Sequence, residues 1–389
     1  PINSHSVKEI DDPTPGKGQV ALRVKACGVN FADTLIVQGL YQEKPETPFV
    51  PGAEVAGEVL ALGEGVKGVE VGQRVIALVS TGGFAEIALA SAATLIPLPE
   101  GIAFTDAAAF TIAYGTSHVA LETRAQLKSG ETLMINGASG GVGLTAVEIG
   151  KQMGATVIGL ASTEEKRELV RSRGADHVFD VADPELRDKV KALGGADVGY
   201  DVIGGDAFNT MLRCMKFEGR LLTVGYASGE IPKVPANLLL VKNISVVGVY
   251  WGSYARHNPG VMMGSLMKLM GWLKDGKLKP HVSDIVPLDQ ATRGIEALAM
   301  RKSGFAHFNL SPEDVHQWRL EQQRLDAAEP RRQRQRLRLV RWLWDAAQSR
   351  RQRQRLVQQR QPRERDEPPP ERAEAAGRAR CAVHCQRRG

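Results

Sequence analysis

Residues 133–150, LMINGASGGVGLTAVEIG, decide how most of this chain is expected to fold. A short apolar run comes first, four glycines follow within seven residues, and apolar residues then recur at close to helical spacing. This order predicts a strand, a glycine turn and a helix, which is the beginning of a dinucleotide-binding βαβ unit. Glycine suits that turn because it adopts backbone angles that other residues resist and lets backbone N–H groups approach a pyrophosphate.

The glycines follow the spacing G-x-x-G-x-x-G rather than the stricter G-x-G-x-x-G, and a glycine pattern alone also fits an ordinary tight turn. A strand and a helix flank this turn in the order that cofactor binding requires, so we favour cofactor binding. The residues expected to contact the cofactor here are Gly137, Ser139, Gly140, Gly141, Val142 and Gly143.

Beyond the turn, short apolar runs alternate with helical patterns. Strands are expected at 132–136, 156–161, 177–180, 197–203, 220–226 and 244–250, and helices from 141 onward and at 163–172, 184–193 and 206–215. Six strands alternating with helices predict a doubly wound parallel sheet in an α/β fold. Asp183 is expected to cap the helix 184–193, and further helices are expected at 260–275 and, capped by Asp289, at 288–301.

The chain before the turn has a different character. Residues 1–103 contain short apolar or alternating runs punctuated by proline and glycine turns, which predict a small, irregular, barrel-like domain. An apolar helical pattern over 104–121 leads into the dinucleotide-binding domain, which we place at 104–246. The chain is then expected to return to the first domain over 247–310.

The last segment, 311–389, has a net charge of +9 from 20 arginines and 11 acidic residues, whereas residues 1–310 carry a net charge of −3. Because it has little apolar content, it is expected to be a disordered, low-complexity basic tail. An alternative is a basic helix over 332–355 that contains Trp342 and Trp344 and binds nucleic acid or a membrane surface. We favour a wrong reading frame after residues 303–310, because the segment lacks lysine, isoleucine, asparagine and other residues with A/T-rich codons.

The rest of the composition bears on location. No apolar run approaches membrane-spanning length, no signal peptide is visible, and four scattered cysteines do not make a disulfide framework. These features indicate a cytoplasmic protein without a membrane partner.

Eight segments make the chain resemble the zinc-free quinone oxidoreductase branch of the medium-chain dehydrogenase/reductase superfamily, to which zeta-crystallin is similar. They occur in the family's order: ACGVNFADTL (26–35), PGAEVAGEV (51–59), VGQRVIAL (71–78), AYGTSHVAL (113–121), NGASGGVG (136–143), STEEKRELVRSRGADHV (162–178), DVIGG (201–205) and LKPHVSDIVPLDQ (278–290). The resemblance implies a GroES-like catalytic domain, a Rossmann domain, and a homodimer or homotetramer.

The chain departs from the family's pattern at both ends. Family members open with an extra strand that begins at methionine, and they close with an apolar strand after a Gly-Lys pair. This chain opens at Pro1 and carries AHFN (306–309) in the place of the closing strand. We therefore expect a clipped N-terminus, the loss of both edge strands, and a weakened catalytic domain.

The resemblance also assigns the acceptor site. Zinc-containing relatives use a cysteine, a histidine and a further cysteine or acid, whereas Asn30 and Ala53 stand at the first two positions here. We expect no metal, and hydride delivery to an already electrophilic quinone or enone. Asn30 would hold the nicotinamide ribose or the substrate oxygen. Tyr41 would donate a hydrogen bond to the developing oxyanion, the alternative being a surface tyrosine of its loop.

The end of the second predicted strand indicates which nicotinamide cofactor binds. NAD enzymes place an acidic residue there for the ribose 2′-hydroxyl, but this chain has Ala161 and Ser162, with Lys166 and Arg167 on the next helical turn. A small neutral pair beside cations suits a 2′-phosphate, so we expect NADPH rather than NADH. The alternative is that the two cations form a solvated helix face and pair with neighbouring glutamates.

Three more residues complete the predicted cofactor site. Thr116 matches a family residue near the nicotinamide, and Gly225 and Tyr226 follow the fifth strand, where the carboxyl ends of the strands meet the cofactor, unless they pack in the core. The sequence therefore predicts an NADPH-dependent, zinc-free reductase of a small quinone or enone. The alternatives are a reductase of 2-enoyl thioesters, similar to acryloyl-CoA reductases, and an RNA-binding or crystallin-like protein, with nucleic acid the less favoured partner.

Overall fold

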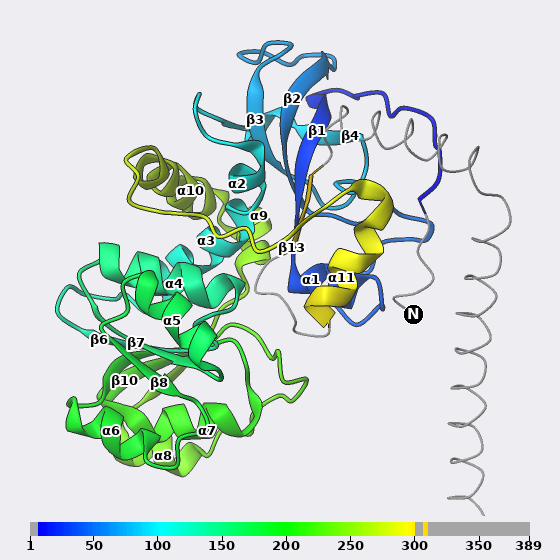
Figure 1. Ribbon diagram of the computed structural model, residues 1–389. Helices are drawn as coiled ribbons and strands as arrows, with labels where there is room; N and C mark the ends of the chain where they lie inside the picture. The colour runs from blue at the N-terminus through cyan, green and yellow to red at the C-terminus, as the bar shows by residue number, and fades with distance from the viewer. Residues whose placement is uncertain (1–6, 300–305, 310–389) are drawn as a thin grey trace, which may run out of the picture. The chain divides into compact units, whose positions relative to one another are not determined.

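The computed structural model describes residues 7–299 and 306–309, and within these ranges the strands form two sheets (Figure 1). One sheet has six strands in the order β11-β10-β9-β6-β7-β8. The other has seven, in the order β12-β13-β1-β2-β3-β5 with β4 paired to β1. The expected basic tail 311–389, with its alternatives of a helix or a wrong frame, and the expected clipping before residue 7 lie outside the described residues.

The six-stranded sheet is parallel throughout and confirms the predicted Rossmann architecture. Its strands are β6 (Thr132–Asn136), β7 (Thr156–Ala161), β8 (His177–Asp180), β9 (Ala196–Asp201), β10 (Met215–Thr223) and β11 (Ser245–Gly248). The strand order reverses between β6 and β9, which is where a sheet of this kind binds its ligand at the carboxyl ends of the strands.

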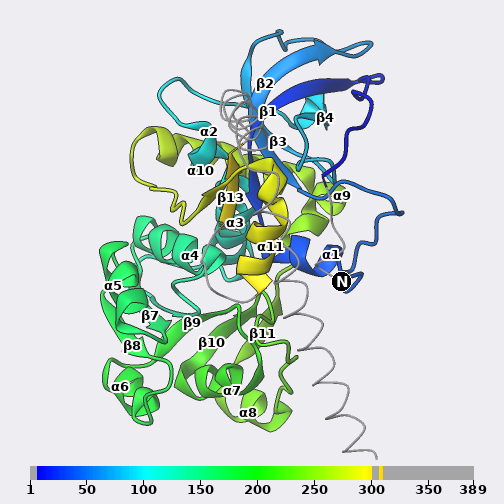
Figure 2. The ribbon, with the colours of Figure 1, turned by 45° about the vertical axis from the view of Figure 1, so that its right-hand side comes forward.

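Helices cover both faces of this sheet because its strands alternate apolar side chains to both sides. Leu133 and Ile135 pack in one cluster with Val147 of a helix, whereas Met134 between them packs in another with Phe208. The first face carries α4 (Gly141–Gln152) and α5 (Glu164–Ser172). The second carries α6 (Leu186–Ala192), α7 (Gly205–Cys214) and α8 (Ala236–Lys242) (Figures 1 and 2).

Several predicted boundaries were wrong for local reasons. The helix expected at 184–193 begins at Leu186, because Asp183 Oδ1 accepts from the Glu185 N–H over 2.8 Å and closes a turn before the helix instead of capping it. The helix expected at 288–301 is divided into a 3₁₀ turn, Leu288–Gln290, and α11 (Ala291–Ala299). Asp289 lies inside that turn and is not a cap.

The seven-stranded sheet forms the GroES-like domain. Its long strand β1 (Gln19–Val29) pairs antiparallel with β2 (Glu54–Leu62) and β4 (Ile87–Ser91). The strands β3 (Arg74–Leu78), β5 (Ile96–Pro97) and β12 (Ile285–Val286) extend the sheet. Alternate residues of β1, including Val20, Leu22 and Val24, enter a core with β2 and β3, which is the reason for the alternating pattern in the sequence.

The expected loss of the closing edge strand was wrong. Residues Ala306–Asn309 form β13, which pairs antiparallel with β1, from Ala26↔Asn309 to Val29↔Ala306, and parallel with β12. Strand β13 thus forms through backbone hydrogen bonds to β1, although the four-residue sequence of β13 has no apolar pattern.

Within the seven-stranded sheet, α1 (Phe31–Ile36) lies between β1 and β2. Other helices connect the two sheets along the chain: α2 (Phe104–Ala108), α3 (Thr111–His118) with a π-helical continuation (Val119–Arg124), α9 (Tyr254–His257) and α10 (Pro259–Lys274). Helix α10 packs on α3 (Figure 1). There the His118 ring meets Trp272 edge-on and shares a 2.9 Å hydrogen bond with Ser265. None of the helices within the described ranges combines the length and apolarity needed to cross a bilayer.

Candidate active site

The glycine turn lies between β6 and α4, as predicted. Gly137 has a φ of +73°, a conformation that side chains resist, and Gly140 is the N-cap of α4. A Cβ on Gly143 would overlap the carbonyl oxygen of Gly137, so only glycine allows the helix to approach the turn this closely. The 12-residue helix therefore presents free N–H groups at its N-terminus, where its dipole favours a phosphate.

The remaining residues of the turn are partly buried. Ser139, Gly140 and Gly141 all retain some exposure, so their backbone can be reached by a ligand. Val142 lies in the first turn of α4, and its carbonyl oxygen accepts a 2.8 Å hydrogen bond from Ser117 Oγ of α3. This bond fixes the start of α4 against the helix that carries Thr116.

A buried carboxylate holds the neighbouring loop at the point where the strand order reverses. Asp201 ends β9 and is fully buried. Its oxygens accept from Asn136 Nδ2 over 2.8 Å, from the Ile203 N–H over 3.1 Å and from the Gly204 N–H over 2.9 Å. Asp201 thereby joins the ends of β6 and β9 and shapes the DVIGG loop beside the glycine turn.

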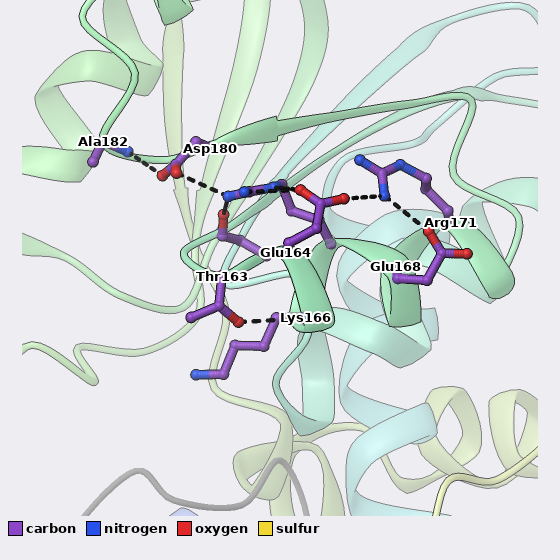
Figure 3. Close-up of polar contacts among 9 residues, drawn as sticks. Thr163, Glu164, Lys166, Glu168, Arg171, Asp180 and Ala182 are labelled. Atoms are coloured by element: carbon purple, nitrogen blue, oxygen red, sulfur yellow. Dashed lines mark hydrogen bonds and ion pairs between the residues drawn. The ribbon is translucent and has the colours of Figure 1, made fainter.

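At the end of β7, Ala161 is buried and Ser162 is exposed. Thr163 caps α5 by accepting from the Lys166 N–H over 3.3 Å (Figure 3). Arg167 is mostly buried, and its guanidinium pairs with Asp180 at 2.8 Å and with Glu164 at 2.9 Å. A contact of Arg167 with a 2′-phosphate stays a prediction.

Lys166 differs from Arg167. Its side chain is exposed and extends away from the Glu164–Arg171 ion pairs (Figure 3). Within residues 7–299 and 306–309, its ammonium group has no acidic partner. Lys166 is thus the cation beside Ser162 whose charge is available to a ligand.

Asn30 lies at the N-cap of α1 and is held by two buried acids. Its backbone N–H donates to Asp33 Oδ2 over 2.7 Å, and its Nδ2 donates to Glu54 Oε1 over 2.8 Å. Burial raises the pKa of Asp33 to about 7. Burial also raises the pKa of Glu54, and the hydrogen bonds that its carboxylate accepts oppose this shift.

Tyr41 lies on the loop after α1 and packs edge-on against Tyr250, with 6.4 Å between the ring centroids. Tyr250 donates to Glu43 over 3.2 Å, and Glu43 also pairs with Arg256 at 3.1 Å. Burial and the nearby tyrosine and acids raise the pKa of Tyr41, so its phenol stays protonated at neutral pH. The loop position is therefore fixed from the 250–256 segment, and Tyr41 is partly buried rather than a freely exposed loop residue.

The other predicted cofactor residues lie near the same strand ends. Thr116 is partly exposed on α3, next to Gly115, where a Cβ would overlap the ring of Trp251. Strand β10 ends at Thr223, so Gly225 and Tyr226 lie on the loop that follows it. The Tyr226 ring packs over Gly204, and its hydroxyl accepts from Thr223 over 3.3 Å.

Sequence reasoning missed two residues of the site, Glu54 and Asp201. Each is an acid within or at the end of an apolar strand, and a charge in such a place is buried only when it has partners. That was the available signal, but the side chains that donate to these two acids lie 24 to 65 residues away in the chain. No group of three or more histidine, cysteine, aspartate or glutamate residues that could hold a metal occurs in the part of the chain that the structure describes.

Comparisons with known proteins agree with this architecture. A family model described as "Alcohol dehydrogenase GroES-like domain" matches residues 16–100, and one described as "Zinc-binding dehydrogenase" matches residues 141–266. The chain is 42% identical over 294 residues to the quinone oxidoreductase-like protein 2 homolog of Nematostella vectensis, covering 74% of this chain and 80% of the relative.

Two further similarities are to proteins named quinone oxidoreductase. The mouse protein of that name is 35% identical over 290 residues, which cover 73% of this chain and 86% of the relative. The structure of the quinone oxidoreductase from Thermus thermophilus, described also in its complex with NADPH, superposes with a TM-score of 0.69 at 32% identity and covers 78% of this chain and 95% of that one. With its two domains and its glycine turn in the matching order, the chain belongs to the quinone oxidoreductase family of medium-chain dehydrogenases/reductases, a family of oxidoreductase enzymes.

Proposed function

We propose that this protein is an NADPH-dependent reductase that delivers hydride to a quinone or enone without a metal. The observation that carries the proposal is the end of β7, where no acid stands at Ala161 or Ser162 and the exposed Lys166 is nearby. A 2′-phosphate needs such a cation and excludes the acid that a 2′-hydroxyl prefers. The NADPH complex of the Thermus thermophilus relative supports the same cofactor.

The residues present fit a bound dinucleotide. Gly137 and Gly143 let the turn and α4 pack closely, which holds the N–H groups at the N-terminus of α4 where a pyrophosphate could bind, and Asp201 keeps the adjoining loop in place. When bound, NADPH supplies the hydride. Tyr41 then donates a hydrogen bond to the oxygen on which negative charge develops, while a proton from solvent completes the reduced acceptor.

The chemistry of the donor set favours a reaction without zinc. Asn30 and Ala53, at the positions of the first two ligands in zinc-containing relatives, offer an amide and a methyl group, and neither is a zinc ligand. Quinones and enones are electrophilic without a Lewis acid. They are therefore the acceptors that this site can reduce.

Replacing Lys166 by alanine tests the cofactor assignment. We expect kcat/KM for NADPH to fall about tenfold, because one charge-assisted phosphate contact is lost, while kcat/KM for NADH stays the same. Lys274→Ala, the same change at another exposed lysine, the last residue of α10, should alter neither value. An equal loss with both cofactors would show that Lys166 acts on something other than the 2′-phosphate.

We also propose that the protein forms a homodimer through the edge of the six-stranded sheet. Strand β11 is paired on one side only among the described strands, and the preceding helix α8 leaves Leu240 77% and Val241 67% exposed. An open edge beside apolar side chains is typical of a surface that pairs with another chain. Sedimentation should give twice the chain mass, and Leu240→Glu together with Val241→Glu should halve it. A wild-type monomer at about 10 μM would contradict the proposal.

A further inference from the structure

Asn30 has its N–H groups directed at buried acids. Its Nδ2 donates to Glu54 Oε1, and its backbone N–H donates to Asp33 Oδ2. Glu54 is 2% exposed and Asp33 is 1% exposed, so water does not replace these contacts. The amide of Asn30 is thus oriented by the protein before any ligand binds.

Glu54, the partner of the Asn30 amide, is held as a hydrogen-bond acceptor by its other contacts. Glu54 Oε2 accepts from the Thr111 hydroxyl and from the Ile112 N–H, each over 2.8 Å, at the N-terminus of α3, where the helix dipole favours a negative charge. A Cβ on Gly28 would overlap Glu54 Oε1 and the Ala108 carbonyl oxygen, so the carboxylate fills its space closely. Both oxygens of the Glu54 carboxylate accept hydrogen bonds, so the Asn30 side chain must present its NH₂ group, and not its oxygen, to Glu54.

The polarity of Asn30 follows from this contact. A primary amide carries its acceptor oxygen and its NH₂ group on opposite branches. Because Nδ2 faces Glu54, Oδ1 is turned away from the carboxylate. A ligand hydroxyl that approaches from that side finds an acceptor, whereas an oxyanion meets the oxygen's lone pairs.

We propose that Glu54 is a positioning residue that makes Asn30 a hydrogen-bond acceptor for a hydroxyl of the nicotinamide ribose. The inference rests on the proposed function, and it separates two roles that the sequence left open for Asn30. Asn30 holds the cofactor, and the hydrogen bond to the acceptor's oxygen is left to Tyr41.

The test reverses the polarity of the pair and then restores it. In Glu54→Gln, the new amide keeps its oxygen for Thr111 and Ile112 and turns its NH₂ toward Asn30, which must rotate its own amide and present NH₂ to the ligand. We expect NADPH binding, measured by fluorescence titration, to weaken about tenfold through the lost hydrogen bond. In the double variant Asn30→Asp/Glu54→Gln, the carboxylate and the amide exchange places, an acceptor faces the ligand again, and binding should return to within about threefold of wild type.

A second variant keeps the test informative if Glu54→Gln does not fold. Asn30→Ala leaves Glu54 in place and removes only the amide. It should weaken NADPH binding about tenfold while kcat for benzoquinone stays within about threefold of wild type. A fall in kcat of about 100-fold with unchanged NADPH binding would overturn the inference and assign Asn30 to the oxyanion.

The matched control is Glu58→Gln, the same change at a more exposed position of the same strand, where Glu58 pairs with Lys25 at 3.5 Å. It should bind NADPH as wild type does. The inference is also overturned if Glu54→Gln binds NADPH with wild-type affinity, or if the double variant binds no better than Glu54→Gln. Failure of the proposed function would look different, because the wild-type protein itself would then neither bind NADPH nor reduce benzoquinone.

Discussion

Replacing Tyr41 by phenylalanine is expected to lower kcat for benzoquinone reduction about 100-fold, because the site loses the donor to the developing oxyanion. NADPH binding should stay within about twofold of wild type, because the ring and its packing against Tyr250 are kept. Steady-state kinetics with saturating NADPH, together with a binding titration, measure both values. Because the pKa of Tyr41 is raised, the phenol should keep its proton between about pH 7 and pH 9, so wild-type kcat should not decline over this range for that reason.

Tyr254→Phe is the control for this change. Tyr254 begins α9, close in sequence to Tyr250, and its hydroxyl has no hydrogen-bond partner among the described residues. Its loss should leave kcat unaltered. If Tyr41→Phe retained kcat within about threefold of wild type, Tyr41 would be a loop residue that packs on Tyr250 and has no part in the reaction.

The second large effect is expected from Gly143→Ala. The added methyl group would overlap the carbonyl oxygen of Gly137, and because that contact is with backbone, the turn itself must move. Displacing the N–H groups of α4 from the pyrophosphate should weaken NADPH binding by about 100-fold or more. Calorimetric titration with NADPH measures the loss.

Gly264→Ala provides the comparison. Gly264 lies within α10, and nothing stands within 4 Å of the place where its Cβ would be. Alanine there favours the helix, so stability should rise slightly and NADPH binding should not change. Wild-type affinity in Gly143→Ala would mean that the cofactor does not use this turn.

Three strands of the Rossmann sheet, β6, β7 and β8, begin and end at the predicted residues. β6 and β7 are buried, and the continuous apolar runs of such strands mark them clearly in a sequence. β8 is the half-buried strand at the edge of the sheet. Strand β13 could not be predicted in this way. It exists through backbone pairing with β1, some 280 residues earlier in the chain, and local sequence does not record such a partner.

In the candidate site, too, local features could be predicted from the sequence and contacts between distant segments could not. The glycine turn and Lys166 come from a local strand, turn and helix, and sequence reasoning placed them. The pairing of Arg167 with Asp180 could not be predicted locally, because Asp180 lies on β8 and the register of β7 and β8 puts it opposite Ala161. Glu54 was missed because its significance depends on Asn30 and Thr111, which reach it from other elements.

The end of β7, as we propose, selects NADPH for reduction of a quinone. The most direct measurement is the loss of reduced-nicotinamide absorbance with benzoquinone, using NADPH and NADH on one preparation of the wild-type chain. We expect kcat/KM for NADPH to exceed that for NADH by about tenfold or more, in keeping with one phosphate contact from Lys166. Equal use of NADPH and NADH would contradict it.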